Sequence, residues 1–249
     1  MLVEARATIR LSHGPKENRT RPAIDPLFRS AALAFGPDVI GVILTGNLDD
    51  GTAGLLAVKR SGGTAVIQNP TDAVAPSMPR SAAMHVDIDH KVPLSKLAPL
   101  LVSLSKEQPR AERHLMPDRL RIEADIAADA NMLGDLAKIG DPSIFTCPDC
   151  HGTLLKIRDE HLVRFRCHTG HAFTAQSLLA TLNEATEDTI WSGVRSLQEG
   201  AMLLQHLAQH ARDVGQADEA SRFDREAQDK LEQADQIRKT SRPQRAERG

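Results

Sequence analysis

A strand, a turn with two carboxylates and a helix follow one another early in the chain, and this order limits the possible folds more than any other feature. Residues 39–44 form an apolar, β-branched run that is typical of a buried strand. The next turn contains Asp49 and Asp50, and a helix is predicted over residues 51–60. A second run of the same kind at residues 64–68 completes a βαβ unit, whose two strands must pair in parallel.

Further elements predicted around this unit extend it into a partial doubly wound parallel sheet of the α/β class. The pattern indicates a short strand at residues 5–11 and helices at residues 25–34, 78–84 and 94–105. In open sheets of this class, ligands and catalytic groups gather at the carboxyl ends of the strands. The two carboxylates after the strand at residues 39–44 are therefore candidates for chemistry.

Blocks of sequence on both sides of this turn carry a resemblance to a known family. One block, residues 21–32, precedes the segment with the turn, residues 39–54. Two further blocks, residues 61–69 and 77–83, follow it. Their order resembles the C-terminal part of the chemotaxis protein-glutamate methylesterase family, CheB, over residues 1–105. The resemblance implies hydrolysis of glutamyl methyl esters on chemoreceptors by a Ser-His-Asp triad, with no cofactor for the ester chemistry. It also implies a methylated chemoreceptor or another signalling protein as partner.

The resemblance assigns the acid of the triad to Asp50. A buried carboxylate in this role fixes the tautomer of a histidine and stabilises the imidazolium that forms when the serine attacks. The family has its serine in a Gly-x-Ser-Thr-Gly-Gly turn and its histidine further along, both upstream of the matched region. Its oxyanion contact is a backbone amide at the position of Asn47. Neither the serine turn nor the catalytic histidine occurs in this sequence. We therefore expect a truncated esterase that is inactive alone unless another chain supplies that half.

Two simpler interpretations of this region stay open. Asp49 or Asp50 could cap the helix that begins near Gly51, because aspartate is common at such positions. The chain could also be a non-catalytic zinc-binding module for protein interaction or regulation that retains part of an esterase. A phosphate-binding loop is not indicated, since the pattern Gly-x-x-x-x-Gly-Lys is absent.

A second candidate site lies in the short segment that contains all three cysteines of the chain. Cys147 and Cys150 form a Cys-x-x-Cys turn, and a predicted β-hairpin brings Cys167 and His171 back to it. Thiolates and imidazole are preferred zinc ligands, and four protein ligands leave no position open for water. These side chains therefore predict a closed Cys3His zinc site of the structural type.

Alternatives remain for the fourth ligand and for the thiols themselves. His168 or His151 could take the place of His171. A redox-active pair and ordinary buried thiols are competing interpretations of the cysteines, although the βαβ context of a thioredoxin-like motif is absent around Cys147. A module of this size buries little apolar surface, so bound zinc would contribute to its folding.

The remaining sequence predicts four further segments. Charged residues and prolines at residues 106–142 indicate a linker, and residues 143–175 form the zinc-ribbon-like module. Over residues 176–240 apolar side chains recur at alternating intervals of three and four, which predicts an antiparallel helical hairpin. Residues 241–249 are rich in arginine, lack an apolar pattern, and are expected to be a disordered tail.

Composition excludes several classes of protein. The formal net charge is −2, so no global basic field indicates nucleic-acid binding. No apolar run approaches the roughly 20 residues that a membrane-spanning helix needs. The first residues lack the apolar region of a secretory signal. We therefore expect a cytoplasmic protein without membrane insertion.

Overall fold

The computed structural model describes residues 1–4, 6, 8–107, 118–129 and 135–241. It divides the chain into two compact units, Met1–Ala180 and Thr181–Gly249, and each is described by itself. Nearly all of the tail predicted at residues 241–249 lies outside the described residues.

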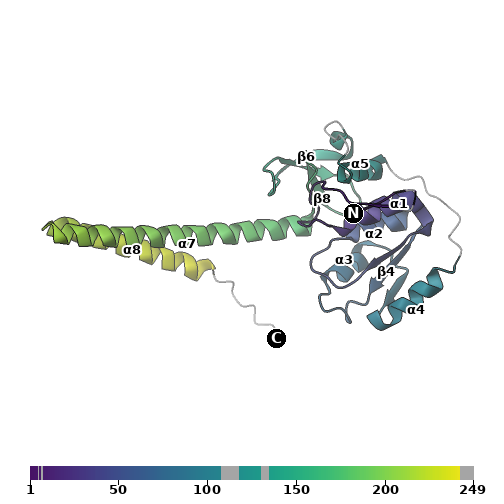
Figure 1. Cartoon of the computed structure of the whole chain (residues 1–249), viewed down its shortest axis with the longest axis horizontal. Helices are drawn as coiled ribbons and strands as arrows, with labels where there is room; N and C mark the ends of the chain where they lie inside the picture. Colours follow the sequence, from purple (N-terminus) through teal and green to yellow (C-terminus); the bar gives the residue numbers. More distant parts are fainter. Residues whose placement is uncertain (5, 7, 108–117, 130–134, 242–249) are drawn as a thin grey trace. The chain divides into compact units, whose positions relative to one another are not determined.

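A three-stranded parallel sheet forms the centre of the first unit (Figure 1). Its strands, β3 (Ile40–Ile43), β4 (Thr64–Gln68) and β5 (His90–Val92), lie in the order β3-β4-β5. In the register of the first pair, Ile40 lies opposite Thr64. The predicted α/β class with a parallel sheet is confirmed.

Helices alternate with these strands as the βαβ pattern requires. They are α1 (Ile24–Phe35), α2 (Thr52–Arg60), α3 (Ser77–His85) and α4 (Leu94–Leu104), with a short 3-10 turn at Gly36–Asp38. α1 packs against α2, and α2 contacts both β3 and β4. The core between helices and sheet is aliphatic, and its fully buried members include Ile43, Leu55, Val58, Ala65 and Ile67.

The strand predicted at residues 5–11 is the second strand of a small hairpin. β1 (Leu2–Glu4) pairs antiparallel with β2 (Thr8–Arg10), and β1 packs against α1. Residues 5 and 7 lie outside the described part of the chain.

The structure differs from the linker predicted at residues 106–142. Within it, α5 (Asp118–Ala127) packs against α1, and α6 (Leu136–Ile139) follows. Leu120, Glu123 and Ile126 are buried. Their spacing of three residues places them on one face of α5.

The cysteine-containing segment folds as a four-stranded antiparallel sheet in the first unit. Its strands are β6 (Gly140–Thr146), β7 (Thr153–Ile157), β8 (Arg164–Cys167) and β9 (Ala172–Thr174), in sequence order. β7 and β8 form a hairpin with Leu154 opposite Cys167.

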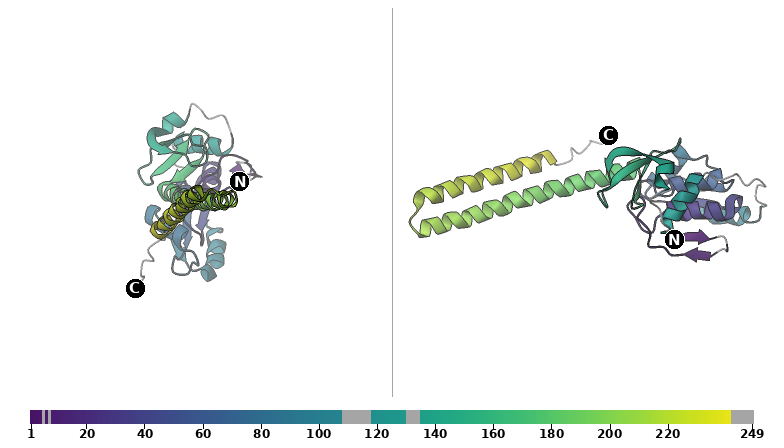
Figure 2. Two further views of the ribbon diagram at one scale, coloured as in Figure 1. Left: turned by 90° about the vertical axis from the view of Figure 1, so that its left-hand side faces the viewer. Right: turned by 90° about the horizontal axis from the view of Figure 1, so that it is seen from above.

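The second unit consists of two helices that lie side by side in both views of Figure 2. α7 (Ala175–Asp213) starts directly after β9 and continues into this unit, and α8 (Ala217–Ser241) follows a turn in which Gly215 has a φ of +80°. The buried side chains of both helices are mostly alanine, among them Ala201 and Ala227. Small residues let two helix backbones approach closely. Among the described residues, no helix combines the length and hydrophobicity that crossing a bilayer requires.

Candidate functional site

Asp50 lies in the turn between β3 and α2, at the carboxyl end of the strand. Its Oδ2 accepts a hydrogen bond of 2.7 Å from the amide of Ile24, and its Oδ1 accepts longer bonds of 3.3 Å from the amide of Asp25 and from Asn18 Nδ2. The carboxylate thus binds the free amides at the start of α1, a favourable place for negative charge.

Asp50 does not cap the helix that follows it. The residue before α2 is Gly51, whose φ of +89° is left-handed, and no side chain caps α2. The simpler interpretation of Asp50 as the cap of its own helix is therefore wrong. A capping role exists, but it serves α1.

A second carboxylate, Asp25, lies beside Asp50 and is 2% exposed. Its Oδ1 accepts a bond of 2.6 Å from the Gly54 amide, and its Oδ2 accepts one of 2.8 Å from Asn18 Nδ2. Burial, reinforced by the negative charge of Asp50, raises the pKa of Asp25 to about 7. Burial also raises the pKa of Asp50, although the amide of Ile24 opposes the shift. The two residues form a pair that shares one amide donor.

Asp49, which precedes Asp50 in the turn, is the third acid of this group. It is 5% exposed, and its Oδ1 has no hydrogen-bond partner among the described residues. Burial raises its pKa as well. We name Asp25, Asp49 and Asp50 together the acid turn.

The described residues that donate to Asp50 include no histidine. His13 is exposed, and its carbonyl oxygen accepts a hydrogen bond from Arg21. Asn47, at the position matched to the oxyanion contact, is exposed near the acid turn. The donors to Asp50 are thus two backbone amides and Asn18, while the charge of His85 acts on the neighbouring Asp49 and opposes the rise of its pKa.

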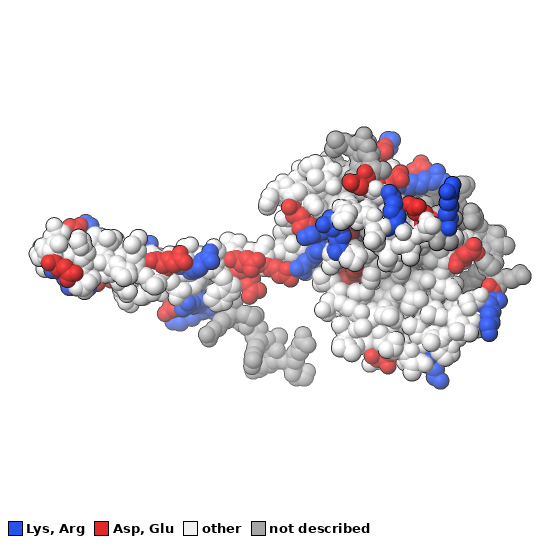
Figure 3. Space-filling model, in the orientation of Figure 1, with Lys and Arg blue, Asp and Glu red and all other residues white. Residues whose placement is uncertain are grey.

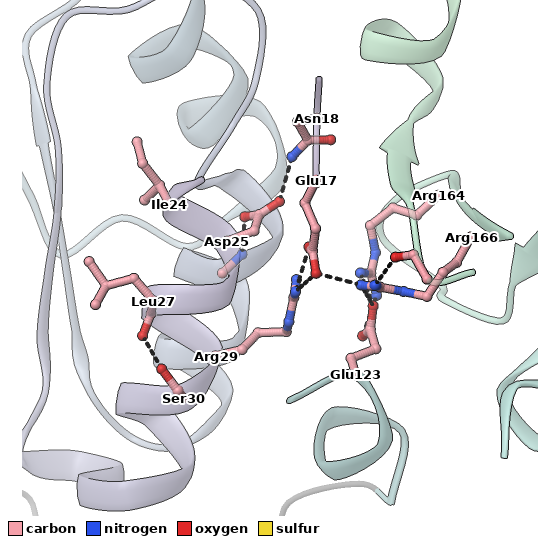
Figure 4. A network of polar contacts seen from close by, with 12 residues as sticks. Glu17, Asn18, Ile24, Asp25, Leu27, Arg29, Ser30, Glu123, Arg164 and Arg166 are labelled. Carbon is pink, nitrogen blue, oxygen red and sulfur yellow. Dashed lines mark hydrogen bonds and ion pairs between the residues drawn. The ribbon is translucent and has the colours of Figure 1, made fainter. Parts of the chain in front are cut away.

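Sequence reasoning missed a buried ion network that joins the first hundred residues to α5 and β8 (Figure 4). Arg29 donates to Glu17 at 2.6 Å, and Arg166 donates to Glu17 at 2.9 Å. Arg164 donates to Glu123 at 2.7 Å, and Arg166 also reaches Glu123 at 3.3 Å. All five side chains are at most 9% exposed. The facing guanidinium groups lower the pKa of both glutamates despite their burial.

The structure brings Cys147, Cys150, Cys167 and His171 into one cluster, with their ligand atoms within 4.8 Å of one another. The Cys150 and Cys167 sulfurs are 3.5 Å apart, and His171 Nδ1 lies 3.7 Å and 3.6 Å from the sulfurs of Cys147 and Cys167. A tetrahedral zinc ion with its usual bond lengths separates two sulfurs by about 3.8 Å, and a sulfur and a nitrogen by about 3.6 Å. The donor set and its spacing fit zinc.

The two alternative histidine ligands are not members of this cluster. His151 and His168 are both exposed. The ring of His168 covers Gly152, where an added Cβ would lie 2.3 Å from its Cε1. Neither ring belongs to the cluster of ligand atoms.

Charged side chains of both signs are interspersed on the upper part of the first unit in Figure 3. The lower part of the same face, over α3, shows few charges. Val74, in the loop before α3, and Met84 of α3 are exposed apolar side chains.

Comparison with known proteins identifies the first part of the chain. Residues 1–101 match the family model described as CheB methylesterase. A protein-glutamate methylesterase/protein-glutamine glutaminase of Anaeromyxobacter dehalogenans is 40% identical over 103 residues, which are 41% of this chain and 29% of that protein. A Leptospira interrogans relative named for the same two activities is 41% identical over 106 residues, 43% of this chain and 55% of its own.

The chain therefore spans about half, or less, of the length of these relatives. The catalytic domain of CheB methylesterase from Thermotoga maritima, known from a crystal structure, is 32% identical. That likeness covers 39% of this chain and 49% of the other, with a TM-score of 0.34. The sequence matches show that residues 1–101 belong to the CheB methylesterase family.

Proposed function

We propose that this chain, as a member of the CheB methylesterase family over its first 101 residues, supplies the acid of a Ser-His-Asp triad that hydrolyses glutamyl methyl esters. The observation that carries the proposal is the placement of Asp50. Its carboxylate lies at the carboxyl end of β3, is fixed by three donors, and is the residue to which the resemblance assigns the role of the acid. In this role Asp50 would orient a histidine and stabilise its protonated form while a serine attacks the ester carbonyl.

The serine and the histidine would come from a segment outside this sequence. Supporting this, β3 pairs only with β4 among the described strands, so its other edge can accept a further strand. A segment that pairs there would bring its own strand ends to the same edge of the sheet as Asp50. The chain alone would then be inactive, and it would act when this segment is present.

Methanol release from a methylated chemoreceptor tests this proposal. Purified chain alone should release no methanol above background. Addition of a CheB fragment that carries the Gly-x-Ser-Thr-Gly-Gly turn and the catalytic histidine should produce turnover, because the triad is then complete. Clear turnover by the chain alone, or none from a mixture in which the two parts are shown to bind, would contradict the proposal.

The substrate is proposed to be a methylated chemoreceptor, a signalling protein. The relatives' names also include a glutaminase activity. Hydrolysis of a glutamine amide passes through the same kind of tetrahedral intermediate as hydrolysis of a glutamyl ester. The same triad could therefore serve both reactions, and exposed apolar side chains such as Val74 and Met84 would offer contacts for a receptor helix.

For the cysteine-containing sheet, we propose a zinc-ribbon-like module with a structural zinc ion. The spacing of the Cys147, Cys150, Cys167 and His171 ligand atoms supports this role, as does the burial of Cys147 and Cys167. Bound zinc would join the turn before β7 to the turn between β8 and β9. It would thereby stabilise a small sheet with few apolar side chains of its own.

Protein purified without chelator should contain about one zinc ion per chain. Replacing both Cys147 and Cys150 with serine should abolish binding, because only two ligands of the cluster remain. His151→Ala and His168→Ala serve as matched controls and should retain the metal, since neither ring belongs to the cluster. Elemental analysis measures the content. A wild-type protein free of zinc, or loss of zinc in both histidine controls, would exclude this ligand set.

A further inference from the structure

Asn18 connects the acid turn to the cysteine-containing sheet. Its side-chain nitrogen Nδ2 donates to Asp25 at 2.8 Å and to Asp50 at 3.3 Å. Its side-chain oxygen accepts bonds of 3.1 Å from the Thr174 amide and from Ser177 Oγ. Asn18 is 6% exposed, and its φ of +48° is one that asparagine tolerates better than most residues. One side chain thus holds carboxylates on one side and the start of α7 on the other.

The backbone around Asn18 is bound to the strand that follows His171. The backbone amide of Asn18 donates to the Ala172 carbonyl at 2.8 Å, and the backbone amide of Ala172 donates to the Lys16 carbonyl at 3.2 Å. Ala172 directly follows the cluster residue His171. The position of Asn18 therefore depends on the position of β9.

Arg166 ties the neighbouring residue to the same turn. It precedes the cluster residue Cys167, is fully buried, and donates to the Gly170 carbonyl at 2.7 Å and to Glu17 at 2.9 Å. The turn between β8 and β9 closes with a bond of 3.0 Å from the Cys167 amide to the His171 carbonyl. Both cluster residues of this turn thus lie one residue away from a contact to Glu17 or Asn18.

We propose that Asn18 is a positioning residue that couples the Cys-His cluster to the acid turn, so that metal bound in the cluster holds Asp25 and Asp50 in place. This inference rests on the proposed zinc site and on the proposed role of Asp50. With the metal bound, the turn between β8 and β9 is closed and β9 holds Asn18 against both carboxylates. Without it, β9 loosens and the acid turn loses its shared donor.

Hydrogen exchange of the full chain, followed by mass spectrometry, tests the coupling. In the Cys147→Ser/Cys150→Ser variant, amides at residues 17–25 and 49–54 should exchange at least about tenfold faster than in the zinc-bound protein, as expected when local opening becomes easier. Residues 64–68 of β4 serve as the internal reference and should not change. Equal acceleration at β4 would mean that the unit unfolds as a whole, which would overturn the proposal.

Asn18→Ala is the variant that tests the coupling while leaving the Cys-His cluster intact. It should keep its zinc, yet show about the same acceleration at residues 49–54, because the donor to both carboxylates is gone. The carboxyl 13C resonance of Asp50 should move in this variant and in the metal-free protein, a change that a merely structural role would not produce. Unchanged exchange and an unmoved resonance in Asn18→Ala would overturn the coupling. A wild-type protein without zinc would overturn the metal part alone, and none of these readouts requires esterase activity.

Discussion

Replacing Glu123 with glutamine should lower the free energy of unfolding by about 3 to 5 kcal/mol, the usual cost of leaving buried charge uncompensated. Glu123 is 1% exposed and lies between Arg164 and Arg166. Glutamine keeps the shape of the side chain but removes its charge. Arg164 would then keep only Asp159 as a carboxylate partner, and Arg166 would share Glu17 with Arg29.

Urea unfolding at saturating zinc measures this change. If the free energy of unfolding falls with urea concentration at the same slope in the variant and the wild type, the compactness of the folded and unfolded states is unaffected. Glu4→Gln is the matched control, because Glu4 pairs with Arg10 at the surface with 48% of its side chain exposed. We expect that substitution to change the stability by less than about 1 kcal/mol. If Glu123→Gln were as mild as Glu4→Gln, the network would not hold α5 and β8 to the first hundred residues.

Raising the pH from 5 to 8 should lower the free energy of unfolding by about 2 to 3 kcal/mol, because Asp25 loses its proton in the folded chain over this range. The pKa of Asp25 rises from its ordinary value of 3.8 to about 7 in the folded chain, because of burial first and the charge of Asp50 second. A carboxyl whose pKa is raised by folding contributes stability that is fully present below its pKa in the unfolded chain. This stability is lost as the pH rises through its pKa in the folded chain. Arg29 opposes the shift and Glu17 adds to it.

Asp25→Asn isolates this effect, because asparagine does not titrate. The variant should be less stable at low pH, since its amide group would face the Asn18 donor, but its stability should fall less between pH 5 and 8 than that of the wild type. The difference between the two pH profiles of thermal or urea unfolding is the quantity to compare. It removes contributions common to both proteins, such as zinc binding. Parallel profiles would show that Asp25 titrates normally in the folded chain.

The central βαβ unit and the helices of the first hundred residues could be predicted because each is specified by neighbouring residues, whereas the short strands β1 and β5 were missed. The β-branched run of β4 and its predicted bounds agree with the structure at residues 64–68. The alternation of strand and helix fixes the parallel pairing of β3 and β4. The grouping of Cys147, Cys150, Cys167 and His171 also follows from local spacing and a hairpin.

The rest of the site depends on contacts between residues far apart in the sequence. Glu17 and Arg166 are 149 positions apart, and neither lies in a pattern that marks it as buried. Asn18 reads as a loop residue, and Asp25 as an ordinary acid in the first turn of a helix. The interpretation of Asp50 as the cap of α2 was wrong because the backbone amides that donate to Asp50 belong to the start of α1, 25 and 26 residues away. A single sequence carries no signal for such pairs.

The role of Asp50 is tested most directly by methanol release from the mixture of this chain with the serine- and histidine-bearing CheB fragment. Asp50→Asn should reduce the rate by about three to four orders of magnitude, because the histidine is no longer held in its active tautomer. Asp87→Asn, whose side chain is 89% exposed, should leave the rate unchanged. Binding of the fragment, measured in parallel, shows that each variant is folded. A mixture that keeps its full rate with Asp50→Asn, or loses it only with Asp49→Asn, would contradict the assignment of Asp50 as the triad acid.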